Sequence, residues 1–406
     1  MSNYLPKGFR DYMLDGADLL HEAAEKVAGV YARWGFRRFI PSAIEDADTF
    51  GQGADLNLLQ QSFRFPDRTG DLLVLRSDMT LQAARVLSGE LAGATPPLRL
   101  FYADRVFRHV PEGQGRLREV WQAGVELAGV SGPEADAEII AVTLDALREV
   151  GVTDVQVDIG HAAFVREFLT ALNLAPDVQH SLASALERKD ARGLLELRES
   201  GLLSPDHYTQ SLALIEAFGL SSLDEVERAG FPVSADAVAQ LRGIITVLET
   251  YGVDARFTFD PGEIRGFDYY TGFFFHVYSS EVGRPLAAGG RYDGLLKEYG
   301  RDLDAVGCAI DLAAVLPSLP VVDTKRIHIV NLRDARDDAL RLAREFRNAG
   351  ACVSREIIRR SWEETLVFAR KLSIDWIVVL EQDGMERVVR VADEKDLSIA
   401  DLRGKL

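Results

Sequence analysis

The chain has 406 residues, of which 47% are hydrophobic and 27% are charged, a composition typical of a soluble globular protein with two or three domains. It contains no apolar run long enough to cross a bilayer, and its first residues, MSNYLPKGFRDYM, lack the apolar centre of a signal peptide. Its two cysteines, Cys308 and Cys352, lie far apart, which excludes a disulfide framework and a cysteine-based zinc site. We therefore expect a cytoplasmic protein that does not bind membranes.

The charge is unevenly distributed along the chain. The net charge is −17 overall, but residues 324–406 carry 17 Lys and Arg against 15 Asp and Glu, a net +2, which leaves −19 on the first 323 residues. Nucleic-acid backbones are bound through clustered basic side chains. The acidic body of the chain is therefore weak evidence against a nucleic-acid partner.

The first third of the chain alternates between helix and strand patterns. Residues 19–34 have apolar side chains at helical spacing, which predicts an amphipathic helix, and the following GFRRFIPSAIE predicts a strand that ends at Pro41. DLLVLRSDMTLQAARVL predicts a strand and then a helix that begins near Asp78, because Asp and Thr favour helix starts. PLRLFYADRVFRHV and EVWQAGVELAG flank the polar loop PEGQGRLR, which predicts a long antiparallel hairpin.

Two later regions have patterns of their own. Residues 164–249 are rich in Leu, Ala and Glu at helical spacing and predict a helical insertion. After the proline-marked segment PSLPVVDT, strand and helix patterns alternate, which is typical of a small α/β domain with parallel strands. We expect a core domain over residues 1–320, which includes the insertion, and a C-terminal α/β domain over residues 325–406.

The segment EIRGFDYYTGFFFHVY, residues 263–278, joins an aromatic strand pattern to charged residues that a strand does not need. Three other segments, RSDMT, QAGVE and AAGGRYDGLL, supply carboxylates, hydroxyls, an amide and close-approach glycines. In QAGVE, Gln122 and Glu126 lie on one face of a strand. Carboxylates and hydroxyls bind an ammonium group and arginine binds a carboxylate, so these groups suit a free amino acid.

Each of these features also has an ordinary structural explanation. The Arg265–Asp268 pair suits a structural ion pair, the paired tyrosines suit core packing, and GGRYDG suits a turn. The seven histidines lack the spacing of metal ligands, so no metal site is expected. The order of the residues does not identify a Ser-His-Asp or Cys-His arrangement either.

Taken in order, PKGFRDY, GF…IPSAIE, LRSDMT, FRH…GRLRE…QAGVE, RGFDYYTG and GGRYDGLL resemble the histidyl-tRNA synthetase family over nearly the whole chain. RGFDYYTG and GGRYDGLL resemble that family's histidine motifs. The resemblance implies an α+β fold: a class II synthetase-like antiparallel sheet flanked by helices, with a helical insertion and a small C-terminal domain resembling an anticodon-binding domain. It also implies a homodimer formed through the GFRRFIPSAIE region.

The same resemblance implies a site for free histidine. The Asp and Thr of RSDMT, with Gln122, would face the ammonium group. Arg265 would face the carboxylate, and Glu126 with one of the paired tyrosines would hold the imidazole. The predicted histidine-binding residues are Asp78, Thr80, Arg108, Gln122, Glu126, Arg265, Tyr269 and Tyr270.

The nucleotide motifs depart from the family's pattern. The late motif GxxxGLxR reads GCAIDLAA here, so Asp311 replaces the second glycine and Ala314 replaces the phosphate-binding arginine. Losing a cation and gaining a carboxylate both disfavour a bound triphosphate. The earlier motif Phe-Arg-x-Glu ends in Val110, which cannot accept a hydrogen bond from adenine. Asp78 is also one methylene shorter than the family's glutamate. We therefore expect no catalytic residue and no cofactor.

A chain that binds histidine without activating it resembles a second family, the regulatory subunits of ATP phosphoribosyltransferase. That transferase is the first enzyme of histidine biosynthesis. That resemblance implies a separate catalytic subunit as partner, histidine as an effector and no bound tRNA. The alternatives are an active histidyl-tRNA synthetase with a divergent ATP motif and a free-standing histidine sensor that acts on another enzyme.

Many such regulatory subunits lack or shorten the C-terminal domain. This chain has one, and the domain carries Arg355, Arg359 and Arg360. These arginines suit either RNA or a solvated or subunit-facing surface, and the overall acidity favours the surface.

Overall fold

The computed structural model describes residues 5–54, 56–110, 117–217, 219, 223–224, 235–262, 270–319 and 325–406. The chain divides into two compact units, Met1–Pro320 and Val321–Leu406, and each has a hydrophobic core of its own. Within the described residues, no helix is both long enough and apolar enough to span a lipid bilayer.

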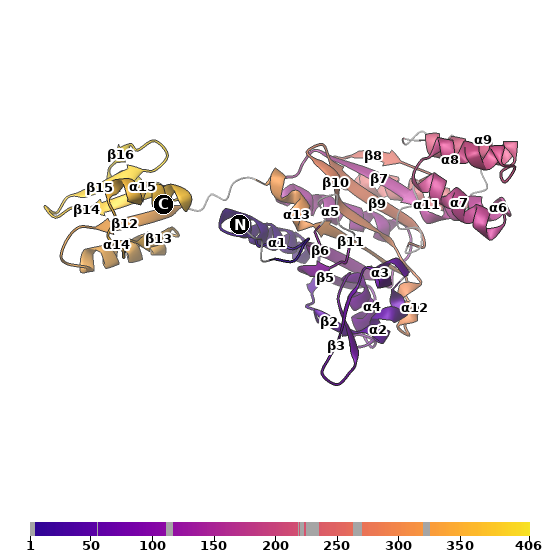
Figure 1. Ribbon diagram of the computed structural model, residues 1–406, viewed down its shortest axis with the longest axis horizontal. Coiled ribbons are helices and arrows are strands. Elements are labelled where there is room, and N and C mark those ends of the chain that lie inside the picture. The colour runs from indigo at the N-terminus through magenta and orange to yellow at the C-terminus, as the bar shows by residue number, and fades with distance from the viewer. Residues whose placement is uncertain are drawn as a thin grey trace. The chain divides into compact units, whose positions relative to one another are not determined.

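The larger unit is built on an eight-stranded sheet (Figure 1). In sheet order, its strands are β1 (Arg37–Arg38), β5 (Leu98–Phe107), β6 (Glu119–Ala128), β11 (Ala305–Asp311), β10 (Val282–Arg291), β9 (Phe273–Ser279), β7 (Val155–His161) and β8 (Arg256–Phe259). The inner pairs are antiparallel, and the two edge strands, β1 and β8, run parallel to their neighbours. The predicted α+β class and the predicted hairpin of β5 and β6 are therefore confirmed.

Three amphipathic helices build the main core with this sheet: α1 (Asp15–Arg33), α5 (Pro133–Glu149) and α11 (Ala235–Tyr251). Helices α1 and α11 both pack on α5. The buried face of α1 includes Leu20, Val27 and Tyr31 at helical spacing, as the sequence pattern predicts. These side chains belong to the same hydrophobic cluster as strand residues such as Val125 and Phe275. The helices and the sheet therefore share one continuous core.

A smaller layer lies beside strand β5. It contains the three-stranded sheet β2 (Ile44–Asp46), β4 (Leu72–Leu75) and β3 (Phe63–Pro66), with helices α2 (Ala47–Gly53), α3 (Leu56–Gln60), α4 (Thr80–Ser88) and α12 (Leu295–Glu298). Helix α4 begins two residues after Asp78, whose carboxylate accepts a hydrogen bond from the Thr80 amide at 2.8 Å. The predicted helix start near Asp78 is confirmed.

The region predicted as a helical insertion is divided between two cores. Helices α6 (Ala162–Ala171), α7 (Pro176–Glu187), α8 (Ala191–Glu199) and α9 (Pro205–Glu216) share a separate cluster around Phe168, Leu182 and Leu214. Helix α11, by contrast, contributes Leu241 and Ile244 to the main core. The last helix of the region is therefore part of the main body, where it packs on α5.

The C-terminal unit is a five-stranded sheet with the order β13-β12-β14-β15-β16. Its elements are β12 (Arg326–Asn331), α14 (Asp337–Asn348), β13 (Cys352–Arg355), α15 (Trp362–Lys371), β14 (Trp376–Leu380), β15 (Glu386–Arg390), β16 (Asp396–Leu397) and α16 (Ile399–Arg403). Strands β13 and β14 run parallel to β12, which is the parallel component that the alternating pattern predicts.

Candidate functional site

A cavity of about 650 Å³ opens in the larger unit where the ends of β6, β10 and β11 meet the start of α4. We refer to it as the central cavity. Two neighbouring strands build its floor, because Gln122 and Glu126 of β6 lie directly opposite Asp311 and Gly307 of β11. The predicted residues that line it are Asp78, Thr80, Arg108, Gln122 and Tyr270.

Glu126 lies beneath this cavity and is the most deeply buried of the predicted residues that the structure describes, with 1% of its surface exposed. The Thr80 hydroxyl donates to its Oε1 at 2.8 Å, and the Tyr292 hydroxyl donates to its Oε2. Two hydroxyl groups from distant segments therefore orient this carboxylate. Thr80 orients Glu126 as well as lining the cavity, so the two predicted residues belong to one network.

Tyr292 is a site residue that sequence reasoning did not select. It lines the central cavity next to Arg291, which was considered with it as part of GGRYDGLL. Adjacent residues of an extended chain point to opposite sides, and only the tyrosine faces the cavity. Strand alternation was the signal that could have separated the two residues.

Burial changes the acid–base properties of this carboxylate. It raises the pKa of Glu126 to about 8, and the nearby Asp78 carboxylate acts in the same direction, while the hydrogen bonds from Tyr292 and Thr80 oppose the shift. Burial also raises the pKa of the Tyr270 hydroxyl. Near neutral pH, Glu126 therefore carries its proton in the ligand-free protein, and a cation or an N–H donor placed against it would favour the ionised form.

Two glycines make room for the protein's own side chains at this site. A methyl group on Gly307 would overlap Oε2 of Glu126, and a methyl group on Gly290 would come within 2.7 Å of the Tyr270 ring. The sequence suggested that the glycines of AAGGRYDGLL let a ligand approach the backbone. In the structure, glycine at position 290 accommodates a tyrosine that lines the cavity.

We predict that Gly307→Ala lowers the free energy of unfolding by about 1–3 kcal/mol, because the added methyl group forces Glu126 away from its two hydroxyl donors. Urea unfolding at pH 7 measures this change. The matched control is Gly16→Ala in α1, where no atom lies within 4 Å of the added methyl group. Equal stability of Gly307→Ala and the wild type would show that Glu126 is not confined in this way.

The remaining charges around the cavity are arranged in pairs. Arg108 contacts Asp78 at 3.2 Å, and Arg284 pairs with Asp311. Arg10 lies over the ring of Tyr12, at 4.3 Å from its centroid. Gln122 differs, because its side chain is 7% exposed and its Oε1 has no hydrogen-bond partner among the described residues. Buried acceptors in folded proteins have hydrogen-bond partners as a rule, so this oxygen is a candidate contact for a ligand donor.

The residues of the late nucleotide motif have surroundings that the sequence did not predict. Asp311 lines the cavity and caps the short helix α13 (Leu312–Val315), where it accepts from the Ala314 amide at 3.0 Å. Its charge is balanced by Arg284, so it is not the isolated carboxylate that the sequence suggested. Ala314 is 2% exposed and packs in the main core, whereas Ala313 lines the cavity. Ala314 therefore supplies no positive charge to the cavity.

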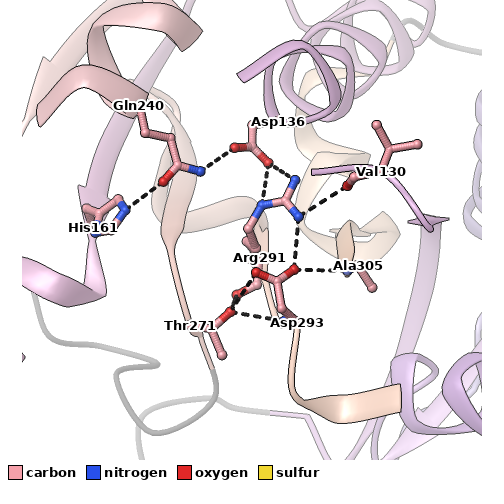
Figure 2. A network of polar contacts seen from close by, with 8 residues as sticks. All are labelled: Val130, Asp136, His161, Gln240, Thr271, Arg291, Asp293 and Ala305. Atoms are coloured by element: carbon pink, nitrogen blue, oxygen red, sulfur yellow. Dashed lines mark hydrogen bonds and ion pairs between the residues drawn. The ribbon is translucent and has the colours of Figure 1, made fainter. Parts of the chain in front are cut away.

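Arg291, at the end of β10, and Asp293, in the turn that follows it, have structural roles (Figure 2). Arg291 donates through Nε to Asp136 Oδ1 at 2.9 Å and through Nη1 to Asp293 Oδ1 at 2.9 Å. The side chains of Arg291 and Asp136 are almost completely buried. The structural explanation therefore holds for this part of GGRYDGLL, because the Arg291 guanidinium is buried and bonded to both Asp136 and Asp293.

Two of the predicted residues, Arg265 and Tyr269, lie outside the residues that the structure describes. Within the described residues, no group of three or more His, Cys, Asp and Glu side chains could hold a metal ion. The C-terminal arginines differ from one another: Arg360 pairs with Glu356 and lies over the Phe368 ring, whereas Arg359 is exposed. Part of this cluster is therefore internal to the C-terminal unit.

Comparison with known proteins places this geometry in a family. A sequence model of the histidyl-tRNA synthetase family matches residues 8–315. The regulatory subunit of ATP phosphoribosyltransferase from Geobacter metallireducens is 36% identical over 97% of this chain and 94% of its own length. The protein of the same name from Syntrophotalea carbinolica is 36% identical over 98% of this chain and 95% of its own length.

Solved structures agree with these sequence matches. A Bacillus halodurans protein described as an ATP phosphoribosyltransferase regulatory subunit/histidyl-tRNA synthetase superposes with a TM-score of 0.80 and 27% identity, covering 93% of this chain and 98% of that one. Histidyl-tRNA synthetase from Nostoc sp. PCC 7120, at 22% identity, shares the fold with a TM-score of 0.82 over 100% of this chain and 99% of its own. The chain thus belongs to the family of ATP phosphoribosyltransferase regulatory subunits, whose members here share the histidyl-tRNA synthetase fold.

Proposed function

We propose that this chain is a non-catalytic regulatory subunit of ATP phosphoribosyltransferase that binds free L-histidine in the central cavity and mediates feedback control of a separate catalytic subunit. The supporting observation is the contrast within this one cavity. Glu126 is held by two hydroxyl donors beneath the cavity, while the positions that would bind a triphosphate are occupied by an ion pair and by apolar side chains.

The chemistry of the cavity suggests how the ligand is held. The ammonium group contacts the Asp78 carboxylate and the unpartnered Gln122 Oε1, both of which accept hydrogen bonds. The imidazole donates an N–H to Glu126, which lies at the base of the cavity beside the lining residues Thr80 and Tyr292. The Tyr270 ring forms a wall beside it. Arg265 and Tyr269, which lie outside the described residues, stay predicted contacts to the carboxylate and the ring.

Nucleotide activation is not part of the proposed function. Arg284 is paired with Asp311, and Arg108 is paired with Asp78, so these cations already have counter-ions. Val110 lines the cavity without an acceptor for adenine. A synthetase needs free positive charge at the triphosphate in the transition state, and these pairs reduce it.

Control of a partner follows from linkage. If histidine has a higher affinity for the inhibited state of the complex than for the active state, its binding shifts the population toward inhibition. The names of the relatives support a catalytic subunit as the partner. Those relatives match 97–98% of this chain, so the presence of the C-terminal unit does not favour a synthetase. We propose no tRNA as a ligand, and a cytoplasmic location.

The surface beside β1 supports a homodimer. A groove of about 600 Å³ is lined by Phe39, Val86 and Leu98 among others, and the neighbouring Ile40 is 80% exposed. Exposed apolar surface of this kind is typical of an interface. Analytical ultracentrifugation of Ile40→Asp beside the wild type tests this assignment, and a dimeric variant would contradict it.

Two measurements on the pure chain test the proposed function. We expect calorimetry to show saturable binding of L-histidine and no binding of L-alanine, which has the same backbone groups without the ring. We expect no histidine-dependent exchange of pyrophosphate into ATP. Robust exchange would identify an active synthetase, and an absence of histidine binding would remove the effector from the proposal.

The partner is tested separately by purifying the tagged chain from its native cells. The proposed function predicts that the ATP phosphoribosyltransferase catalytic subunit co-purifies as the main protein. Histidine binding combined with a different co-purifying enzyme would indicate a free-standing histidine sensor instead.

A further inference from the structure

A continuous line of hydrogen bonds runs from the residue that begins the first helix of the insertion to Arg291, the neighbour of the cavity-lining Tyr292 (Figure 2). It starts at His161, the residue that caps the N-terminus of α6, and passes through Gln240 of α11 to Asp136 of α5. Asp136 then binds Arg291 at the end of β10. Four elements that are far apart in sequence are thus joined by side chains alone.

The roles of donor and acceptor along this line are fixed. His161 Nδ1 accepts from the Ala163 amide at 3.1 Å, so the ring proton lies on Nε2, which donates to Gln240 Oε1 at 2.9 Å. The Gln240 amide must then present its Nε2 to Asp136 Oδ2, at 2.7 Å. This leaves Asp136 Oδ1 for the Arg291 guanidinium. A change at either end therefore removes the partner of the next group along the line and weakens the bonds that follow it.

The far end of the line contacts two segments that form the cavity. Arg291 donates to Asp293 at 2.9 Å, and the Asp293 amide donates to the Thr271 hydroxyl at 3.0 Å. The Thr271 amide in turn donates to the Arg291 carbonyl at 2.8 Å. The neighbours of these residues are Tyr270, which lines the cavity, and Tyr292, which holds Glu126.

Helix α6 also contacts this segment directly. The Ala162 amide donates to the Gly272 carbonyl at 2.9 Å, and Arg166 Nη2 donates to the Tyr270 carbonyl at 3.2 Å. Gly272 packs against the Arg291 side chain, so closely that a methyl group there would lie 3.2 Å from its Cδ. The insertion is therefore linked to residues 270–272 both through its backbone and through the side-chain line.

We propose that His161, Gln240 and Asp136 are positioning residues for the central cavity, which act through Arg291 to set Tyr270 and Tyr292, so that the placement of helix α6 controls the affinity for the ligand. The identity of that ligand as L-histidine rests on the proposed function. The positioning role itself rests on the contacts between α6, α11, α5 and β10. Through this line, a partner that moves the insertion changes histidine affinity without touching the cavity.

The test compares Gln240→Leu with the wild-type full chain. Leucine has a similar volume but leaves His161 and Asp136 without their shared partner. We expect L-histidine to bind about three- to tenfold more weakly, the size of effect that coupled positions produce. The matched control is Gln156→Leu on β7, which also removes two side-chain hydrogen bonds, to Asp158 and Thr258, but is not connected to Arg291.

A second variant separates capping from positioning. His161→Asn keeps an acceptor for the start of α6 but is too short to reach Gln240. We expect His161→Asn to weaken histidine binding as much as Gln240→Leu does. We expect the double variant to bind histidine as tightly as either single variant, because each substitution interrupts the same line of hydrogen bonds. Additive losses, or an equal loss in Gln156→Leu, would overturn the proposal and leave only general destabilisation.

Amide hydrogen exchange provides a readout that does not need histidine. The Asp293 amide donates to Thr271, and the Ala305 amide donates to the Asp293 carboxylate at 3.0 Å. We expect both amides to exchange faster in Gln240→Leu and to be unchanged in Gln156→Leu. If the wild type did not bind histidine, the proposed function would fail while this result still supported the positioning role. Unchanged exchange in Gln240→Leu would overturn the positioning role whatever the ligand.

Discussion

Replacing Glu126 with alanine is expected to lower the affinity for L-histidine at least about 100-fold, to the point where calorimetry detects no binding. The imidazole N–H would enter a buried site that has lost its acceptor, and an unsatisfied buried donor costs about 1–3 kcal/mol or more when a charged group is involved. The Thr80 and Tyr292 hydroxyls would also lose the group that orients them. Both losses act on the same cavity.

Two variants make this result specific. Glu126→Gln keeps the volume and one acceptor oxygen but carries no charge, so we expect an intermediate loss. Glu138 lies on α5, where its carboxylate binds Arg99 at 2.9 Å, and it does not line the cavity. We expect the Glu138→Ala variant to bind histidine with wild-type affinity. Wild-type affinity in Glu126→Ala would mean that the ligand site lies elsewhere.

The stability of the ligand-free protein is expected to fall as the pH rises from 5 to 8, and Glu126→Gln is expected to remove most of that fall. The pKa of Glu126 is about 8 in the folded protein, against a usual value of 4.5, because of burial. Between these values the folded state holds one proton that the unfolded state has released. The free energy of unfolding therefore decreases with increasing pH, by on the order of 4 kcal/mol across the window.

Urea unfolding at half-unit steps from pH 5 to pH 8.5 measures this effect in both proteins. The quantity of interest is the difference between wild type and Glu126→Gln, since burial also raises the pKa of Asp136 and Asp293 and gives both proteins a shared slope. We expect the difference to favour the variant increasingly as the pH rises. Parallel curves would show that Glu126 is ionised in the folded protein throughout this range.

The secondary structure that sequence reasoning recovered is the part governed by local periodicity. Strands β5 and β6 are ten residues long each and rich in residue types that favour strands, and the segment PEGQGRLR between them is polar, so their pairing follows from the pattern. The helical spacing of α1 and the strand–helix alternation of the C-terminal unit are equally local. The five predicted site residues that line the cavity were found because motif order supplies information that no single segment contains.

The features that were missed depend on contacts between distant segments. Tyr292 binds Glu126, and Arg284 neutralises Asp311; neither pairing leaves a pattern in the sequence near its members. The burial of Ala314 is similar, because it follows from how α13 packs on the main core. These outcomes are decided by which side chains the sheet register places opposite each other.

By itself, the sequence determined the class of fold, the order of the elements and the family, since these depend on residue spacing and on motifs that keep their order along the chain. The tertiary structure alone decided which charges are free and which are paired. A carboxylate has a different pKa and a different role when folding buries it or places an arginine against it, and that partner can come from any position in the chain. In this protein, the hydrogen bonds that orient Glu126 come from Thr80 and Tyr292, which lie 46 and 166 residues away.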